Sequence, residues 1–361
     1  MTHLIHNAKY SPSRTRRPAS LIEDARNSTP EKSTLPLVRL NLILPFVEEL
    51  DRLRVDADSV LEAQSLTRNS LLDPNQFVSV EIIHQILEDA ASTANDPYLG
   101  VHVGEALDVT NWSPLRDAAQ HATSLSDFLT RFIMAASKDA TSARHTLEIA
   151  GSFTVFGERR VSEPNITPSQ NDGFSAAYVL SILRRAVGSE WDPREVLLQV
   201  CTPGALPADY LGIQIARGDD RGMSIQFPTR WMTRAVDQSG FKQPTQASDE
   251  KNRPATFFPH ALRQILAPHL GRSDLTVDRV ARLCGLSRQA LQRKLSAHGT
   301  NLSREISDLK KQRAVESLVH SGESISAIGE SIGFNNPASF TRAFRAWTGR
   351  SPREYRATES K

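Results

Sequence analysis

The chain has few cysteines and no long apolar run. It holds two Cys in 361 residues, too few for the disulfide framework of a small secreted protein or for a four-thiolate zinc site. No stretch approaches the roughly 18 to 20 apolar residues that a membrane-spanning helix needs. Residues 1–36 contain neither a secretory signal nor a twin-arginine export signal. We therefore expect a cytoplasmic protein without a membrane span.

Motifs of the common enzyme classes are also missing. The sequence has no G-x-S-x-G elbow, no glycine-rich phosphate loop and no H-E-x-x-H zinc motif. Its ten His are scattered, and apart from His3 and His6 no two of them are three or four residues apart. We expect no catalytic residue, no metal and no cofactor, and we expect Cys201 and Cys284 to be buried, apolar packing residues.

Charge is divided unevenly along the chain. The total is only +2, from 43 Lys and Arg against 41 Asp and Glu. From Thr256 to Lys361, however, 17 Lys and Arg face 9 Asp and Glu, a net charge of +8, and the first 255 residues carry −6. A basic carboxyl-terminal third on an acidic body is typical of a nucleic-acid-binding module joined to a second domain. A basic face that serves solubility is the alternative.

The length exceeds the roughly 250 to 300 residues at which single cores stop growing, so two domains are expected. Residues 1–34 are rich in Ser, Thr, Pro and Arg without apolar periodicity, which predicts a disordered tail. Residues 35–236 mix helical and strand-like patterns and predict an α+β domain. Residues 237–259 are polar and turn-rich, which indicates a linker, and residues 260–361 predict an all-α domain.

Six segments of the α+β domain have clear periodicity. Helices are predicted at Val80–Ala90, Leu125–Ala136 and Phe174–Ala186. Strands are predicted at Thr146–Phe156, Glu195–Cys201 and Met223–Phe227. Three aromatic residues of this domain either line a ligand pocket or pack in the core, and we favour the core: Trp112, Tyr178 and Trp191.

One pattern occurs twice in the basic third. Ala281–Leu295 and Gly329–Phe344 each place a small residue four positions before a Gly, and then an apolar residue and a polar helix cap. Such a Gly ends the first helix in the left-handed conformation, and the apolar residue fills the corner. Ser287 caps the second helix of the first copy, and Asn336 with Pro337 begins that of the second. The repeat predicts two helix-turn-helix units.

The second helix of each unit has an apolar and a polar face. Apolar residues at helical spacing are expected to point inward: Leu291, Leu295, Phe340, Phe344 and Trp347. The polar stripes are Gln289, Gln292, Arg293 and Ser296 in the first unit, and Ala338, Thr341, Arg342 and Arg345 in the second. Arg, Gln and small apolar groups are side chains that read base edges in the major groove. A solvated helix face explains one stripe as well, but two matched stripes on the basic third favour DNA binding.

A helix that begins at Ser303 or an adjacent residue joins the two units. Its buried stripe is expected to be Ile306, Leu309, Ala314 and Leu318. Such a connector can hold two reading helices about one DNA turn, roughly 34 Å, apart. Basic residues near the units are expected to contact phosphates, which set the register on DNA rather than sequence preference: Arg288, Lys294, Lys310, Lys311, Arg345, Arg350 and Arg353.

The basic third resembles the DNA-binding domain of the AraC/XylS-type transcription regulators, a tandem helix-turn-helix joined by a long helix. Leu275–Leu295, Gln312–Leu318 and Ile325–Arg356 are the segments that resemble it. The resemblance implies a protein that binds double-stranded DNA. By family position, the residues implied to contact bases are Gln289, Gln292 and Arg293 in the first unit and Ser339, Thr341 and Arg342 in the second.

Residues 35–236 resemble the arabinose-binding-like sensor domain of one branch of this family, through Leu99–Leu107, Trp191–Leu206 and Ile225–Phe227. This resemblance implies a small-molecule effector, bound at residues that the sequence does not identify, and a homodimer. It also implies an activator that contacts RNA polymerase. Two alternatives stay open: a constitutive DNA-binding regulator whose first domain only dimerises, and an enzyme fused to a DNA-binding module.

Overall fold

The computed structural model describes residues 34–108, 112–119, 121–219, 221–236, 253–271 and 275–359. These belong to one compact unit, residues 33–361. Of the expected tail at residues 1–34, only residue 34 is described. Of the expected linker at residues 237–259, only residues 253–259 are described. Residues 34–236 are called the amino-terminal region below, and residues 253–359 the helical region.

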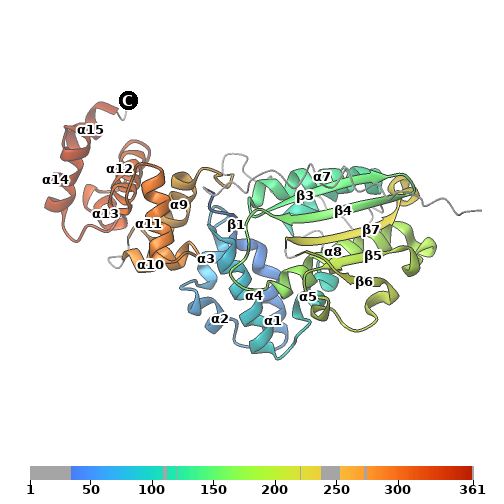
Figure 1. The fold of residues 1–361 in the computed structure, drawn as a ribbon. Helices are drawn as coiled ribbons and strands as arrows, with labels where there is room; N and C mark the ends of the chain where they lie inside the picture. The colour runs from blue at the N-terminus through green and yellow to red at the C-terminus, as the bar shows by residue number, and fades with distance from the viewer. Residues whose placement is uncertain are drawn as a thin grey trace, which may run out of the picture. The chain divides into compact units, whose positions relative to one another are not determined.

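The amino-terminal region is a mixed α/β domain (Figure 1). Its described residues form a five-stranded sheet in the order β3-β4-β7-β5-β6, in which only β5 and β6 run parallel. The strands are β3 (Ala143–Ala150), β4 (Phe153–Arg160), β5 (Leu197–Val200), β6 (Gln214–Arg217) and β7 (Gly222–Pro228). A smaller antiparallel sheet pairs β1 (Leu37–Arg39) with β2 (Phe77–Ser79).

The helices of this region pack on the sheet and on one another. They are α1 (Leu44–Arg52), α2 (Ala57–Ala63), α3 (Arg68–Leu72), α4 (Val80–Ala94), α5 (Leu99–Ala106), α6 (Ser113–Ala119), α7 (Leu125–Asp139) and α8 (Ser169–Val187). The ring centroid of Phe132 on α7 lies 6.1 Å from that of Phe156 on β4 and 5.7 Å from that of Tyr178 on α8. Helices α7 and α8 therefore cover the same face of the sheet. Among the described residues no helix combines the length and apolar character that crossing a bilayer requires.

The predicted helices of this region are confirmed as α4, α7 and α8, and two predicted strands as β5 and β7. The single strand predicted at Thr146–Phe156 is wrong, because the chain turns at Gly151 and Ser152 and forms the β3–β4 hairpin. Gly151 has a φ of +64°, which suits a two-residue hairpin loop that begins with Gly. The alternation of apolar residues continues across this turn, so periodicity alone does not show it.

The helical region contains only helices and turns among its described residues. The helices are α9 (Phe258–Leu266), α10 (Val277–Leu283), α11 (Arg288–Ala297), α12 (Leu302–His320), α13 (Ile325–Ser331), α14 (Pro337–Thr348) and α15 (Pro352–Glu359). The expected all-α architecture with a long connector is confirmed. The connector α12 is capped by Asn301, whose side chain accepts from the Arg304 amide at 3.0 Å, and α9 begins inside the expected linker.

Helix α12 belongs to two hydrophobic clusters. Leu302 and Leu309 pack in a cluster with α9, α10 and α11, which we call the first cluster, and Ala314 and Leu318 pack in a second with α13 and α14. Three of the four residues expected in the buried stripe, Leu309, Ala314 and Leu318, are therefore buried, and Ile306 is half-buried against the first cluster. The first cluster also includes residues of the small β1–β2 sheet and its approach: Leu35, Leu37 and Phe77.

The two cysteines have different surroundings. Cys284 is buried in the first cluster, and burial raises the pKa of its thiol to about 12, as apolar packing requires. Cys201 is also buried, but its thiol donates to the Asp172 carboxylate at 3.0 Å. The expectation of purely apolar packing is therefore wrong for Cys201.

Helices α5 and α8 cross in close contact. A Cβ atom added at Gly104 of α5 would lie 2.6 Å from the carbonyl oxygen of Phe174 and 2.8 Å from Cβ of Ala177. We expect Gly104→Ala to lower the free energy of unfolding by about 1 to 3 kcal/mol, because the methyl group forces the helices apart. Urea denaturation followed by circular dichroism measures this loss.

Gly204 provides the matched control for this substitution. It lies in a short 3-10 turn, Pro203–Ala205, where an added Cβ meets nothing within 4 Å. Gly204→Ala should leave the denaturation midpoint nearly unchanged. Equal losses at Gly104 and Gly204 would contradict the close crossing of α5 and α8.

Candidate nucleic-acid interface

The two expected helix-turn-helix units are α10–α11 and α13–α14, and their turns match in backbone geometry. Gly285 has a φ of +63° and Gly333 a φ of +81°, so both are in the left-handed conformation. In both turns the amide after the Gly donates to the carbonyl five residues earlier, at 2.9 Å: Leu286 to Ala281, and Phe334 to Gly329. This bond closes the first helix of each unit as in a Schellman motif. The sequence repeat is therefore a structural repeat.

The second helix of each unit begins at the predicted cap. Ser287 Oγ accepts from the Ala290 amide at 3.2 Å, and Asn336 Oδ1 accepts from the Ser339 amide at 2.8 Å. Each cap satisfies one of the free amides at the helix start. The caps thus fix where the polar stripe of each helix begins.

The inward faces of α11 and α14 are also as predicted. Four of the five expected residues are buried: Leu291, Leu295, Phe340 and Phe344. Trp347 is half-buried, and its indole nitrogen donates to Ser307 Oγ of α12 at 3.0 Å. This bond ties the end of α14 to the connector helix.

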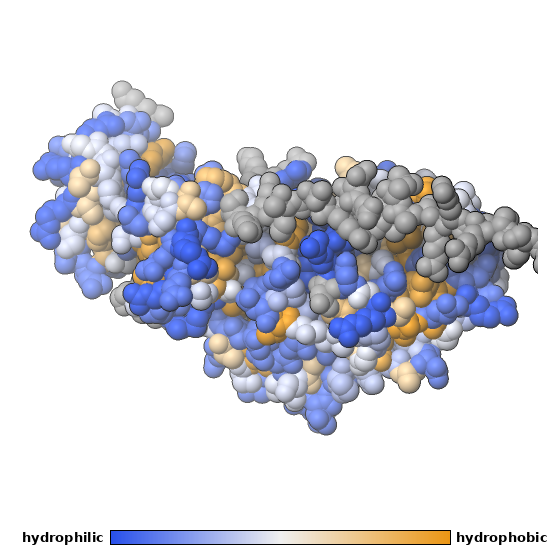
Figure 2. Space-filling view, in the orientation of Figure 1, coloured by the Kyte–Doolittle hydropathy of each residue, from blue (hydrophilic) through white to orange (hydrophobic). Residues whose placement is uncertain are grey.

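The polar stripes face solvent, and the surface of the helical region in Figure 2 is mostly hydrophilic. The expected base-contacting residues are exposed at Gln289, Gln292, Arg293 and Arg342, and half-buried at Ser339 and Thr341. Arg342 Nη2 donates to Ser339 Oγ at 3.2 Å, so these two side chains lie together. The Thr341 hydroxyl donates to the Pro337 carbonyl at 2.8 Å, which leaves the methyl group as its principal means of contacting a base.

Five of the seven expected phosphate-contacting residues are exposed, and three of these five form ion pairs. The partners are Asp278 for Arg288 at 3.5 Å, Glu354 for Arg345 at 3.9 Å and Glu359 for Arg350 at 3.0 Å; Arg353 and Lys311 are also exposed. Exposed pairs of this kind contribute little to stability, so a phosphate can replace the carboxylate. Arg350 is the most constrained, since it also donates to Thr358 at 3.0 Å.

Two of the expected phosphate contacts lie against the helices instead. The Lys294 ammonium is 5.6 Å from the Phe258 ring centroid and 3.4 Å from the Thr34 carbonyl oxygen. The Lys310 ammonium is 4.9 Å from the Phe334 ring centroid. Burial lowers the pKa of both lysines. A helical wheel shows the face on which a lysine lies, but not which neighbouring element its flexible chain will contact.

The turn of the first unit contacts the amino-terminal region. Asn165 Nδ2 donates to the Gly285 carbonyl at 2.9 Å, and the Asn165 amide donates to Glu81 Oε2 at 2.9 Å. A Cβ added at Gly285 would lie only 2.4 Å from Cβ of Glu81. We call this group of three residues the turn contact. Nothing in the sequence pattern marks Glu81 or Asn165 for this role.

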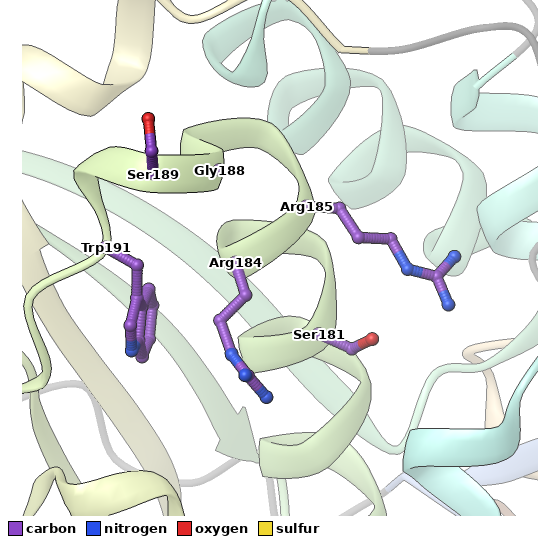
Figure 3. Close-up of a pocket in the computed structure, with 6 residues that line it drawn as sticks. All are labelled: Ser181, Arg184, Arg185, Gly188, Ser189 and Trp191. Carbon is purple, nitrogen blue, oxygen red and sulfur yellow. The ribbon is translucent and has the colours of Figure 1, made fainter.

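Two cavities of the amino-terminal region have the size of small-molecule sites. Figure 3 shows an open one of about 550 Å³, lined by Ser181, Arg184, Arg185, Gly188, Ser189 and Trp191. The Arg184 guanidinium lies 5.8 Å from the Trp191 ring centroid, whereas Arg185 points away from that ring. The other, of about 320 Å³, has Trp112 among its lining residues, whereas Tyr178 is buried in the core. Among the described residues no group of three or more His, Cys, Asp and Glu could hold a metal ion.

Known domain families match both regions. A helix-turn-helix domain family matches residues 260–358, and the arabinose-binding domain of AraC transcription regulators, found at their amino terminus, matches residues 55–236. The second match alone covers half of the chain. The chain belongs to the AraC family of transcription regulators. This family consists of DNA-binding regulators rather than enzymes, so the alternative of a fused enzyme is set aside.

Several AraC-type proteins are similar to this chain over part of their length. The ornithine utilization regulator of Pseudomonas aeruginosa is 35% identical over 80 residues, 22% of this chain and 24% of that protein. The regulator GadX of Escherichia coli is 32% identical over 82 residues, 23% of this chain and 30% of that protein. The chain thus spans less than a third of each curated relative. The solved structure of the regulator CdpR from P. aeruginosa is 16% identical, with 83% of this chain and 96% of that one covered and a TM-score of 0.37.

The turn contact predicts a difference between two glycines of the helical region. Gly285 and Gly299 have φ values of +63° and +66°, but an added Cβ meets nothing within 4 Å at Gly299. Alanine at either position costs about 1 to 2 kcal/mol of left-handed strain. Gly285→Ala should cost at least about 1 kcal/mol more, because the methyl group also collides with Glu81. Urea denaturation of both variants measures the difference, and equal losses would mean that Glu81 does not contact this turn in solution.

Proposed function

We propose that the AraC-type chain recognises specific DNA sequences by inserting α11 and α14 into the major groove. The observation that supports this most is the matched pair of turns, each followed by a capped helix with an exposed polar stripe. The proposed base-contacting residues are Gln289, Gln292 and Arg293 on α11, and Ser339, Thr341 and Arg342 on α14. Arg can bond O6 and N7 of guanine, Gln can bond N6 and N7 of adenine, and the Thr methyl can contact the thymine methyl.

The length of α12 supports simultaneous reading by both helices. Its 19 residues extend about 28 Å at 1.5 Å per residue. That length is comparable with the roughly 34 Å between successive major grooves on one face of DNA. One protomer would therefore contact two adjacent grooves. We propose phosphate contacts from Arg288, Arg345, Arg350 and Arg353, whereas Lys294 would contribute mainly through its positive charge.

We further propose that a small-molecule effector bound in the amino-terminal region controls DNA binding. The cavities of that region and the turn contact between Asn165 and Gly285 support this proposal. An effector that binds one arrangement of the two regions more tightly would shift the population toward it. A homodimer, a cytoplasmic location and activation through contact with RNA polymerase are proposals that rest on the family resemblance. The alternative is a constitutive regulator whose amino-terminal region only dimerises.

Arg342→Ala tests direct reading by the second unit. With an operator selected from random duplexes by the full chain, the substitution should weaken binding by roughly 1 to 3 kcal/mol and relax the preference at one base pair. Arg313→Ala is the matched control, because Arg313 is an exposed arginine of α12 outside both stripes. Equal losses for Arg342→Ala on the operator and on scrambled DNA would show that Arg342 contacts only phosphate.

Arg353→Ala tests contact with the DNA backbone. Arg353 is exposed, and Arg350 is less suitable because its pairing with Glu359 adds a structural effect. The substitution should weaken binding to all sequences alike and reduce the slope of log affinity against log salt by about 1. An unchanged slope in titrations at several salt concentrations would remove Arg353 from the proposed interface.

Effector control predicts stabilisation by ligand. A metabolite that binds the native state must raise the melting temperature. At a ligand concentration a hundred times the dissociation constant, the free energy of unfolding increases by about 2.7 kcal/mol. Thermal melts of the full chain against a metabolite panel, repeated with operator DNA, measure both binding and its effect on the DNA complex. A ligand that stabilises the chain without changing DNA affinity would favour the constitutive alternative.

A further inference from the structure

A cluster of charged side chains is buried between β4, α4 and α8 of the amino-terminal region. Arg160 of β4 is hydrogen-bonded to Asp172 of α8, and the two side chains are only 5% and 1% exposed. Glu158 of β4 has its Oε2 atom 3.5 Å from His145 Nε2. His84 of α4 is 3% exposed and lies among these charges. Buried ionic groups are costly unless they are fully partnered, so the cluster calls for an explanation.

A small cavity opens onto this cluster. Its lining residues are Val80, His84, Ser142, Ala143, Glu158, Arg160, Ser162 and Asn171. The centre of a water-sized group can occupy about 20 Å³ of this cavity. The cavity can therefore hold one compact group but not a whole metabolite.

A buried ring nitrogen at this cavity lacks a hydrogen-bond partner within the described part of the chain. His84 Nδ1 has no hydrogen-bond partner among the described residues. Burial lowers the pKa of His84 to about 4, so the ring is neutral at pH 7 and Nδ1 can accept a hydrogen bond when Nε2 carries the proton. A buried polar atom without a hydrogen-bond partner destabilises the folded state. A donor in the cavity would remove that cost.

The lining favours a donor that carries positive charge. Burial by itself would raise the pKa of Glu158, but His145 and Arg160 lower it to about 2, so this carboxylate is ionised. Asp172 already compensates the charge of Arg160. The hydroxyl groups of Ser142 and Ser162 offer further acceptors. An anion would be repelled by Glu158, whereas an ammonium group has the size, the charge and the donors that these acceptors require.

We propose that this cavity binds the ammonium group of a small primary amine, or the ammonium ion itself. This ligand class is proposed for the effector of the preceding section. The regulatory role of the cavity rests on that proposed function, whereas ligand binding to the cavity can be measured without DNA. The position of the cavity suits regulation. Glu81, which abuts Gly285 in the turn contact, is one helical turn before His84 on α4, and the charge of Arg160 acts on both.

Thermal melts of the full chain test the proposal directly. Ammonium chloride and methylammonium chloride should raise the melting temperature along a saturable curve. Sodium chloride and tetramethylammonium chloride at equal ionic strength should not, since neither cation has an N–H donor. If ammonium and sodium salts act alike, the cavity holds water only and the proposal is wrong.

Variants locate the binding. Glu158→Gln keeps the size of the side chain and removes its charge, so the ammonium affinity should fall at least tenfold. Ser142→Ala removes one neutral acceptor and should weaken binding a few-fold, which provides a milder test if Glu158→Gln does not fold. Glu163→Gln, an exposed acid outside the lining, is the matched control and should bind as the unsubstituted chain does. Unchanged affinity in the folded Glu158→Gln or Ser142→Ala variant would overturn the assignment.

The melts test the assignment of this site, and DNA-binding measurements test the proposed function, so the two can be refuted separately. Saturable binding that requires Glu158 supports the site even if operator affinity does not respond to ammonium, and only the regulatory meaning is then lost. Loss of sequence preference in the full chain would contradict the DNA-reading proposal without affecting the melts. If both responses appear and Glu158→Gln abolishes both, the cavity is the effector site.

Discussion

The placement of α11 and α14 depends on the packing of one helix, α12. Leu309 anchors its first half in the cluster that supports α11, and Ala314 anchors its second half in the cluster that supports α14. Between Leu302 and Leu309, the buried carboxylate of Glu305 accepts from Arg263 Nε of α9 at 2.8 Å and from the Thr300 hydroxyl at 2.6 Å. Because a continuous helix bends little over 19 residues, neither cluster can move without moving the other. The spacing of the two polar stripes is therefore a property of α12.

The sequence predicts this half of the structure well because its signals are local. A left-handed Gly, an apolar corner residue and a polar cap lie within eight residues of each other, and these few positions determine each turn. The contacts of a side chain with neighbouring helices or strands cannot be predicted from such local signals. The spacing on α11 shows that Lys294 lies beside the polar stripe, but only the packing of α9 brings Phe258 next to its ammonium.

The amino-terminal region shows where local patterns fail. The predicted strand Thr146–Phe156 ends where Gly157 follows. In the structure the strand continues to Arg160, and its even-numbered positions keep facing the core. The partners that make these inward charges tolerable, His145 and Asp172, come from other elements. Charged residues at the inward positions of a strand depart from the usual alternation of apolar and polar residues. Such departures are expected at functional sites, where they reduce stability.

The two helix-turn-helix turns differ in their contacts with the amino-terminal region. The first turn packs on Glu81 and Asn165, whereas a Cβ at Gly333 in the second turn would lie 2.6 Å from the Leu270 carbonyl, within the helical region itself. A shift of α4 therefore acts on the first unit directly and on the second through α12. Since α12 packs in both clusters, such a shift would reorient the two stripes together. The proposed effector control would then change how the paired stripes are presented to DNA and would leave their separation intact.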